Sequence, residues 1–554
     1  MKLRNYFLLL CLLLAACVQV DVDRLLENEP TDEIPQPVVE SEEETAVNPT
    51  AESDTTSSES ESPPAVEGDL TIRVDAQRDV RSISPLIYGM SGATPAHSAE
   101  LSLGLNSWGG NPSSRYNWEL GNAWNAGSDW FYRNGNYGFH DGSASDMFFE
   151  EAAAANMDVR LAVPTLGWVA KDDHNDTCSF PNADGSCGNA NNANCNNPTV
   201  VADPTLANVQ SSPESIQNWI RHIQTQGYDL RFVAMDNEPE LWGITHYDVH
   251  PNCTTYAEIL DQYVNYATAV REVAPDVELT GPTTCCWYFY WNSAAGDGDK
   301  ASHDNQDFIP WFLDQMRTHE ETNGDRILDV LDIHYYPANV YNNEVDSATA
   351  ALRLRSTRSL WDPSYSDESW IDEPIYLIPR MKDLIDTHYP DTPLAISEWN
   401  WGADETMNGA LAVADVLGIM GREEIYFAAY WRVPVLQSPG FYAFKMFTNF
   451  DNQGTRFGDT SVWAQSDNLD RVSSFAAVDS TTGKLHLMLI NKQPGQAETV
   501  TLDVAGFEAA ETAVLYQYSG GAEGITETAV SLDETGNTVT LPAYTISLLV
   551  LDPQ

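Results

Sequence analysis

Eight short apolar runs follow one another along the middle of the chain, and they constrain the fold more than any other feature of the sequence. Several of them are separated by amphipathic stretches such as SIQNWIRHIQTQ and YAEILDQYVNYATAVREVA. Strand alternating with helix predicts parallel β/α units, and eight units over roughly 370 residues fit a (β/α)8 TIM barrel with long loops. We therefore predict an α/β fold with the barrel at residues 85–458. The runs, in chain order, are LIYG, LNSWGG, VRLAVP, LRFVAMDNEP, VELTGPTT, VLDIHYYP, PLAISEWN and IYFAAYW.

The last part of the chain has a different pattern. Segments such as KLHLMLINK, ETVTLDVAG and AYTISLLVLD are short strands at regular spacing with turn residues between them, which is typical of a β-sandwich. We predict a small C-terminal β-sandwich at residues 459–554. The segment DLTIRVDA has the same strand character, and we expect residues 69–84 to add to the sandwich instead of the barrel.

The first seventeen residues have the features of an export signal. Lys2 and Arg4 precede a short apolar run, which ends in the small-residue sequence LAAC at Cys17. The run is too short to span a membrane, which takes roughly 20 apolar residues. The cysteine after the small pair resembles a bacterial lipobox and implies cleavage before Cys17 and acylation of its thiol; a plain secretory signal is the alternative. We expect an exported protein that is lipid-anchored to the bacterial cell envelope, or secreted.

Residues 18–68 contain fifteen acidic residues and one basic residue, Arg24, together with many Ser, Thr and Pro. Such a segment cannot bury enough apolar surface to offset the entropy of ordering, and its like charges extend it. We predict a disordered tether, with a degenerate leader as the alternative. The formal net charge of the whole chain is −54. This acidity argues against nucleic acid as a partner, because phosphates call for a basic surface, and it is compatible with a neutral polymer.

Eight cysteines occur, of which Cys11 leaves with the signal and Cys17 would carry the lipid. The remaining six are an even number in an exported protein, which favours disulfides over a zinc site, and fifteen pairings are open. An Asn/Gly-rich insertion carries three of them together with four aspartates, whose oxygens can hold a structural Ca2+; a solvated acidic loop is the alternative. The cysteines are Cys178, Cys187, Cys195, Cys253, Cys285 and Cys286, and the aspartates are Asp172, Asp173, Asp176 and Asp184.

Two glutamates stand out by position among the 82 acidic residues. Glu238 ends the fourth apolar run and Glu398 ends the seventh, and both are flanked by Asn and aromatic residues instead of by lysines. In a (β/α)8 barrel, catalytic residues come from the carboxyl ends of the strands. A solvated surface glutamate, the alternative, would sit among other charges on a helix face.

Four longer strings surround these glutamates: WGGNPSSRYNWELGNAWNAGSDW, DNEPELWGITHYDVHP, LDIHYYP and SEWNWGADETMNGALAVADVLGIMGREEIYFAAYW. In this order and spacing they resemble glycoside hydrolase family 44 of clan A, over roughly residues 80–550. The resemblance implies an endo-acting, retaining enzyme for β-1,4-glucans such as xyloglucan and carboxymethylcellulose-type substrates. It implies that Glu238 is the acid/base and Glu398 the nucleophile, with no cofactor required.

Other readings stay open at this point. The same two glutamates could act on mannan or xylan, because the lining of the groove sets the polymer. A non-catalytic polysaccharide-binding surface protein is a third hypothesis, although such a protein has no need for two glutamates at strand ends. In each case the expected partner is a polysaccharide of the plant cell-wall β-glucan type, and we expect a monomer.

The resemblance also implies roles for residues near the two glutamates. Asn237 would hydrogen-bond the sugar 2-hydroxyl, with a helix N-cap as the alternative role. His334 and Tyr336 end the sixth run, where in the clan such a Tyr contacts the nucleophile; a core His–Tyr pair is the alternative. Trp431 ends the eighth run, where the clan places an aromatic platform under the sugar.

Further contacts are expected after the second run and along the groove. Asn111 and Arg115 would bind sugar hydroxyls. An arginine is expected directly before WGGN in similar sequences, whereas this chain has Ser107 there, which puts that contact in doubt. Pyranose rings stack on aromatic side chains, so several tryptophans are expected to touch sugar while others belong to the core. The candidate sugar platforms are Trp108, Trp118, Trp242 and Trp401.

Overall fold

The computed structural model describes residues 70–138, 143–532 and 537–554. The predictions for the leader, for Cys17 and for the tether lie outside the described residues. Those described form part of one compact unit, Gly68–Gln554. Among them, no helix is both long enough and apolar enough to cross a membrane.

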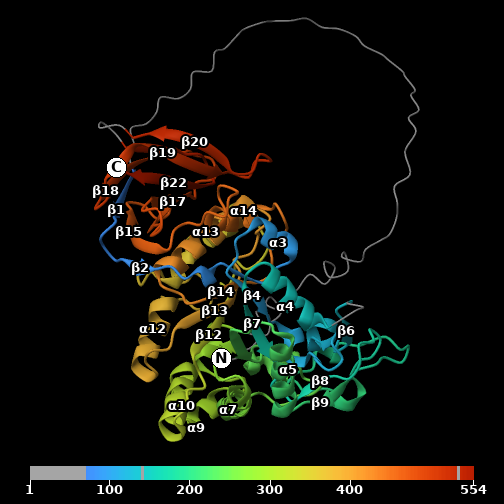
Figure 1. The fold of residues 1–554 in the computed structure, drawn as a ribbon. Coiled ribbons are helices and arrows are strands. Elements are labelled where there is room, and N and C mark those ends of the chain that lie inside the picture. Colours follow the sequence, from blue (N-terminus) through green and yellow to red (C-terminus); the bar gives the residue numbers. More distant parts are fainter. Residues whose placement is uncertain (1–69, 139–142, 533–536) are drawn as a thin grey trace, which may run out of the picture. The chain divides into compact units, whose positions relative to one another are not determined.

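Eight parallel strands close into a barrel, which confirms the predicted fold class (Figure 1). Each strand falls within or directly beside one of the eight apolar runs. Around the barrel, β10 is followed by β11, β12, β13, β14, β3, β4 and β7, which pairs with β10 again. The strands are β3 (Gly89–Ser91), β4 (Leu105–Trp108), β7 (Asp158–Val163), β10 (Phe232–Met235), β11 (Glu278–Thr284), β12 (Val330–Tyr335), β13 (Leu394–Trp399) and β14 (Ala428–Tyr430).

The strands are apolar almost throughout because helices cover their outer face and side chains fill the barrel interior. All six residues of β12 and all six of β13 are buried. The few polar side chains on these strands must therefore find partners inside the protein, since a buried polar group without a hydrogen bond is costly. Those near the carboxyl ends of the strands form the site described below, whereas Asp158 and Glu278, which begin β7 and β11, pair with Arg231.

Helices around the barrel such as α5 bury one apolar face. In α5, Ile216, Trp219, Ile220 and Ile223 are buried at helical spacing, Ser212 caps the first turn, and Gly227 ends the helix in a left-handed conformation. The helices are α3 (Pro95–Glu100), α4 (Ala144–Ala154), α5 (Pro213–Gln226), α6 (Trp242–Thr245), α7 (Tyr256–Val273), α8 (Trp287–Trp291), α9 (Asp297–Ser302), α10 (Phe308–Asn323), α11 (Ser347–Ser356), α12 (Leu377–His388), α13 (Met407–Arg422) and α14 (Pro439–Thr448).

The C-terminal strands form a second sheet, as the sequence pattern predicts. Many of the buried apolar residues of this sheet form a core separate from that of the barrel. Strand β1 belongs to it: β1 lies antiparallel to β15 and parallel to β18, and Figure 1 shows it in blue among the red strands. The order is β20-β19-β22-β17-β16-β15-β1-β18-β21, and β2 pairs with β15. The strands are β1 (Leu70–Asp75), β2 (Arg81–Ser82), β15 (Thr460–Ser466), β16 (Val472–Val478), β17 (Leu485–Asn491), β18 (Glu498–Ala505), β19 (Ala509–Tyr518), β20 (Thr526–Ser531), β21 (Thr538–Leu541) and β22 (Thr545–Pro553).

Helix α13 joins the barrel to this sheet. Its residues from Asn408 to Gly421 are all buried. Gly418 leaves room for the ring of Phe475 on β16, and Asp415 forms a buried ion pair with Lys492, with 2.8 Å between Oδ2 and Nζ. The contact is therefore both apolar and charged.

The long loops carry small hairpins and all six predicted disulfide cysteines. The hairpins pair β5 (Ala123–Asn125) with β6 (Asn134–Asn136) and β8 (Trp168–Ala170) with β9 (Asn208–Gln210). The disulfides join Cys178 to Cys187, Cys195 to Cys253 and Cys285 to Cys286. Two of the three lie in or begin from the Asn/Gly-rich insertion, which has little apolar core of its own.

Candidate active site

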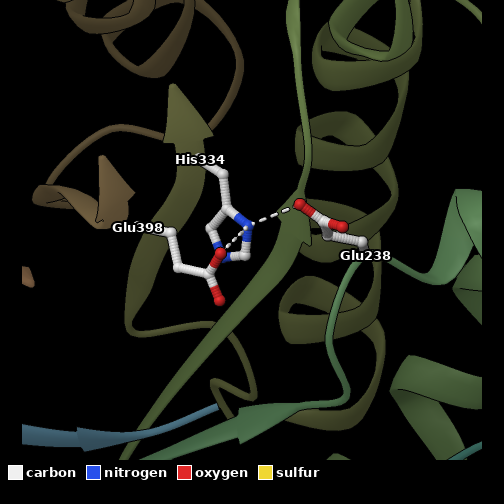
Figure 2. Close-up of side chains that lie close together, drawn as sticks. All are labelled: Glu238, His334 and Glu398. Atoms are coloured by element: carbon white, nitrogen blue, oxygen red, sulfur yellow. Dashed lines mark hydrogen bonds and ion pairs between the residues drawn. The ribbon is translucent and has the colours of Figure 1, made fainter. Parts of the chain in front are cut away.

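Glu238, His334 and Glu398 meet at the carboxyl ends of the barrel strands (Figure 2). Glu238 comes three residues after β10, while His334 and Glu398 lie on the neighbouring strands β12 and β13 and face one another in the strand register. The three side chains therefore come from three different strands. One carboxylate oxygen of each glutamate and one ring nitrogen of the histidine all lie within 4.8 Å of one another.

His334 lies between the two carboxyl groups. Its Nδ1 is 2.9 Å from Oε1 of Glu238 and 3.4 Å from Oε2 of Glu398. The ring is fully buried, and burial lowers the pKa of the imidazole, so the neutral form is favoured. The described residues offer Nε2 no hydrogen-bond partner, so the proton of the neutral ring belongs on Nδ1, where it is donated to Glu238.

Glu398 is buried, and each of its oxygens has a different environment. Oε2 accepts a hydrogen bond of 2.9 Å from the hydroxyl of Tyr336, whereas Oε1 has no partner. Burial raises the pKa of Glu398 to about 7, and the neighbouring Glu238 also raises it, while His334, the Tyr336 hydroxyl and, to a smaller extent, Arg160 lower it. The Tyr336 hydroxyl and Arg160 therefore favour the ionised form of Glu398 and partly oppose the effect of burial.

Glu238 is held in an uncommon backbone conformation. Its φ is 46°, and that of Asp236 is 71°, both in the left-handed region that non-glycine residues rarely adopt. Burial raises the pKa of Glu238 to about 8, and none of the compensating charges seen at Glu398 offsets it. Within this pair, Glu238 is therefore the carboxyl group that keeps its proton more readily.

Two further buried acids hold the strained turn around Glu238. Asp236 accepts hydrogen bonds from the backbone N–H groups of Thr165 and Leu166, so it ties the turn to the loop after β7. Glu240 accepts from the backbone N–H of Cys285, after β11. Burial, together with the neighbouring Glu238, raises the pKa of Glu240 well above its usual value, which favours the neutral form of this carboxyl group.

A chain of side-chain amides leads away from Glu238. Oδ1 of Asn237 accepts from the backbone N–H of Gly110 at 3.1 Å, and its Nδ2 donates to Oδ1 of Asn111 at 3.2 Å. Asn111 in turn donates to Asp129 at 2.6 Å. Because the backbone N–H and the carboxylate sit at the two ends, both amide orientations are fixed, and one N–H of Asn237 remains for another partner.

Trp431 directly follows β14 and lies beside the backbone of Gly110. A Cβ atom on Gly110 would lie 2.3 Å from Cη2 of Trp431, and the φ of Gly110 is +76°. Only glycine satisfies both conditions, so the ring of Trp431 lies directly against the backbone that binds Asn237.

The sequence and fold of this chain match those of known enzymes. Residues 123–339 match the model of glycoside hydrolase family 44. The chain is 30% identical to Endoglucanase A of Paenibacillus lautus over 526 residues, which are 88% of this chain and 73% of that protein. The chain belongs to glycoside hydrolase family 44.

Solved structures agree with this family 44 assignment. CelM2, a bifunctional glucanase-xylanase from a metagenome library, has a TM-score of 0.83 and 36% identity, covering 88% of this chain and 99% of its own. A family 44 xyloglucanase from Paenibacillus polymyxa, solved with xyloglucan, has a TM-score of 0.76 and 28% identity, covering 88% and 100%. This hydrolase therefore has the family fold over nearly all of its described length.

Several residues expected to touch sugar in this family 44 hydrolase are instead structural. Arg115 is fully buried and forms a two-pronged ion pair with Asp248, at 2.6 and 2.8 Å. The prediction that Arg115 binds sugar hydroxyls is wrong, because its guanidinium is buried and paired with Asp248. Asn111 does lie beside the site, but its amide is engaged by Asn237 and Asp129.

The tryptophan predictions fail for a related reason. Trp242 and Trp401 are fully buried: Trp242 donates toward Asp236, and Trp401 donates to the hydroxyl of Ser356. Trp118 donates to Ser215 on α5 and lies beside His222 on the same helix. Trp242 and Trp401 are therefore wrong as sugar platforms, whereas Trp118 is only half-buried and its role stays a prediction. Trp108 is half-buried in an aromatic cluster with Tyr116, Tyr137 and Phe148.

Two functional candidates went unrecognised in the sequence. Arg160 and Asp332 form a buried ion pair beneath the two glutamates, with 2.8 Å between Nη2 and Oδ2. The available signal was a single charged residue inside each of two apolar runs, VRLAVP and VLDIHYYP. Such a charge inside a barrel strand requires a partner, but nothing in the sequence says which one.

Three of the four aspartates of the insertion accept hydrogen bonds through their side chains. Asp172 and Asp173 accept hydrogen bonds from Asn134 and Asn136, and Asp184 closes a turn with Ser186. Within the ranges that the structure describes, the grouping with metal-ligand geometry is Glu238, His334 and Glu398.

Proposed function

We propose that this family 44 hydrolase is an endo-acting, retaining β-1,4-glucanase of the xyloglucanase type, with Glu398 as nucleophile and Glu238 as acid/base. The observation that carries the proposal is the approach of their carboxylate oxygens to within 4.8 Å. Retaining glycosidases separate their carboxyl groups by about 5–5.5 Å, whereas inverting ones leave roughly 6.5–9.5 Å for a water molecule.

The first half of the reaction forms a covalent intermediate. The Glu398 carboxylate attacks the anomeric carbon while the bond to the leaving glycosidic oxygen breaks. Glu238 gives its proton to that oxygen, and the first product leaves with a new hydroxyl group. The sugar on the other side is then joined to Glu398 as an ester.

The second half of the reaction releases the sugar from Glu398. Glu238, now a carboxylate, takes a proton from water, and the water oxygen attacks the anomeric carbon as the ester bond breaks. Glu398 is restored as a carboxylate and Glu238 as an acid. Two inversions at one carbon give net retention.

The geometry supports this division of roles. Glu398 has a hydroxyl donor in Tyr336 and a nearby cation in Arg160, which favour its charge, whereas Glu238 lacks both and keeps its proton. Ester formation removes the charge on Glu398, which lowers the pKa of Glu238 at the moment when it must act as a base. Asn237 would donate its remaining N–H to the sugar 2-hydroxyl, and Trp431 would lie under the sugar ring.

The polymer is assigned by relatedness. The relatives named above are an endoglucanase, a glucanase-xylanase and a xyloglucanase. A β-glucan is therefore the first candidate, and the bifunctional CelM2 favours xylan as the second; mannan is the remaining alternative. A non-catalytic binding protein would not need two glutamates whose carboxylate oxygens approach each other at the ends of the barrel strands.

A panel of polysaccharides with product sizing tests this proposal. We expect hydrolysis of xyloglucan and carboxymethylcellulose, with long products early in the reaction as the mark of endo action. Glucomannan, lichenan and xylan complete the panel. Hydrolysis confined to xylan or mannan would replace the glucan assignment, and release of only mono- or disaccharides from the start would contradict endo action.

We further propose that the protein is exported and held at the cell envelope by a lipid on Cys17, with residues 18–68 as a tether and the folded part a monomer. The chemistry requires no metal, since both proton transfer and nucleophilic attack are carried by carboxyl groups; a structural Ca2+ in the insertion stays a proposal. Labelling with a radioactive fatty acid tests the anchor: wild type is expected to incorporate label and Cys17→Ala is not. Label in both proteins, or in neither, would contradict it.

A further inference from the structure

Arg160 is a buried cation near the proposed nucleophile, and the mechanism above invokes only its charge. It lies on β7, is 1% exposed, and places Nε and Nη2 at 3.0 and 2.8 Å from the same oxygen of Asp332. This fork fixes the guanidinium plane. Its third nitrogen, Nη1, is then directed away from Asp332.

Nη1 extends toward the neighbouring strand. Ser107 on β4 is the register partner of Arg160, and its hydroxyl oxygen lies 3.3 Å from Nη1. The point where Gly109 would carry a Cβ is 3.4 Å from Nη1 and 3.7 Å from Oε1 of Glu398. The guanidinium and the carboxylate thus approach the same small space beside a glycine backbone.

Oε1 is the oxygen of Glu398 for which the described residues provide no hydrogen-bond donor, and it is buried. A buried carboxylate needs a compensating charge, since its isolated transfer from water is very costly. Tyr336 supplies a donor to Oε2 only. Arg160 is therefore placed on the side of Glu398 that lacks one.

The ion pair also reaches the backbone before Glu398. The second oxygen of Asp332 accepts from the N–H of Ser397 at 3.2 Å. The residue that orients Arg160 is thus the residue that holds the strand end of Glu398. The charge near Glu398 and the position of its backbone are therefore both set by the pair of Arg160 and Asp332.

We propose that Arg160 is the positioning residue that keeps Glu398 ionised and aligned for attack, delivering from β7 the positive charge expected at position 107 on β4. The inference rests on the proposed role of Glu398. Because Ser107 and Arg160 are register partners in a parallel pair, their side chains lie on the same face of the barrel wall at the same level. A small residue at position 107 leaves the guanidinium its room.

The groups that face Glu398 and can change its charge state come from three strands: Glu238 after β10, His334 and Tyr336 on or after β12, and Arg160 on β7. Burial raises the pKa of Glu238 to about 8 and lowers that of His334, so Glu238 titrates close to neutral pH and the His334 ring is neutral there. Tyr336 keeps its proton because burial raises its pKa well above the usual value. Arg160 alone carries a permanent positive charge. Its loss should therefore move the pH at which Glu398 ionises.

The test compares Arg160→Gln and Arg160→Lys with wild type by the pH dependence of kcat/KM on the best polysaccharide of the panel. Removing the cation should raise the acid limb by about one pH unit or more, because opposite charges a few ångströms apart shift a pKa by roughly 1–3 units. Arg160→Lys should show a smaller shift. Lys492→Gln is the matched control: it breaks a different buried ion pair, the one with Asp415, and should lower stability without moving the limb.

A folded Arg160→Gln variant with the wild-type acid limb would overturn the inference. If that variant fails to fold, the exchange Ser107→Arg with Arg160→Ser carries the test, since it returns the guanidinium from the partner strand. Recovered activity with a wild-type limb supports the inference, whereas a folded but inactive exchange variant overturns it. Glu398→Ala separates the role of Arg160 from the proposed role of Glu398. If Glu398→Ala stays active, Glu398 is not the nucleophile. If it is inactive while Arg160→Gln keeps the wild-type acid limb, only the role of Arg160 is wrong.

Discussion

The hydroxyl of Tyr336 donates a hydrogen bond of 2.9 Å to Oε2 of Glu398, the same oxygen that lies 3.4 Å from Nδ1 of His334. One oxygen of the carboxylate thus accepts a hydrogen bond from Tyr336 and lies close to the ring of His334. The Tyr336 donor fixes the direction of the carboxylate and stabilises its charge.

Tyr336→Phe should weaken catalysis without disturbing the fold. A hydrogen bond to a charged group contributes about 1.5–3 kcal/mol, so kcat/KM should fall by roughly ten- to a hundredfold. The acid limb of its pH profile should also move to higher pH, because the ionised form of Glu398 loses a donor. Steady-state kinetics over pH measure both effects, and an unchanged limb would show that the hydroxyl only fills space.

Glu398→Ala should abolish turnover and be rescued by azide, which fits the space of the missing carboxylate. Because azide would attack once from the face of Glu398, the glycosyl azide should have the inverted configuration. Glu238→Ala should also lose activity, but its azide product would form from the glycosyl-enzyme with retained configuration. NMR of the products decides: a retained azide from Glu398→Ala would exchange the two roles.

Glu240→Gln provides a control two residues from Glu238. Glu238→Gln should lower activity by about 10^2- to 10^4-fold, the usual contribution of a general acid. Glu240 is held neutral by burial, so an uncharged amide of the same shape should leave activity nearly unchanged.

Stability adds a second readout at Glu240. A carboxyl group whose pKa is raised in the folded state binds a proton that the unfolded chain releases above its ordinary pKa. The contribution of Glu240 to stability should therefore decline as pH rises above about 4.5, and Glu240→Gln should lack that part of the decline. Urea unfolding at pH 5 and pH 8 measures it: the advantage of the variant should be larger at pH 8, and an equal difference at both values would contradict a neutral Glu240.

The fold and the position of the two glutamates follow from sequence because both depend on local pattern. The run LAISEWN shows the apolar strand and the polar residue at its end within seven positions, and the structure has β13 there. Eight such runs in series leave few alternatives to a barrel.

The contacts that complete the site could not be predicted in this way. Arg160 and Asp332 are 172 positions apart, and their pairing depends on barrel closure. Trp401 lies three residues after Glu398 yet is buried, because sequence distance does not tell which face a loop residue presents. The left-handed φ of Glu238 is likewise set by Asp236 and by loops from other strands.

The burial of Arg115 leads to a last prediction that separates a structural from a binding role. Its guanidinium is paired with Asp248, and both side chains are fully buried. Removing one partner of such a pair leaves an uncompensated charge and costs about 3–5 kcal/mol, so Arg115→Met should unfold at markedly lower urea concentration than wild type. At temperatures where the variant is folded, its KM should match wild type, because the side chain reaches no substrate. Asn237→Ala is the contrasting variant: it should leave the unfolding midpoint closer to wild type while lowering kcat/KM. A raised KM for Arg115→Met at wild-type stability would return Arg115 to the binding site.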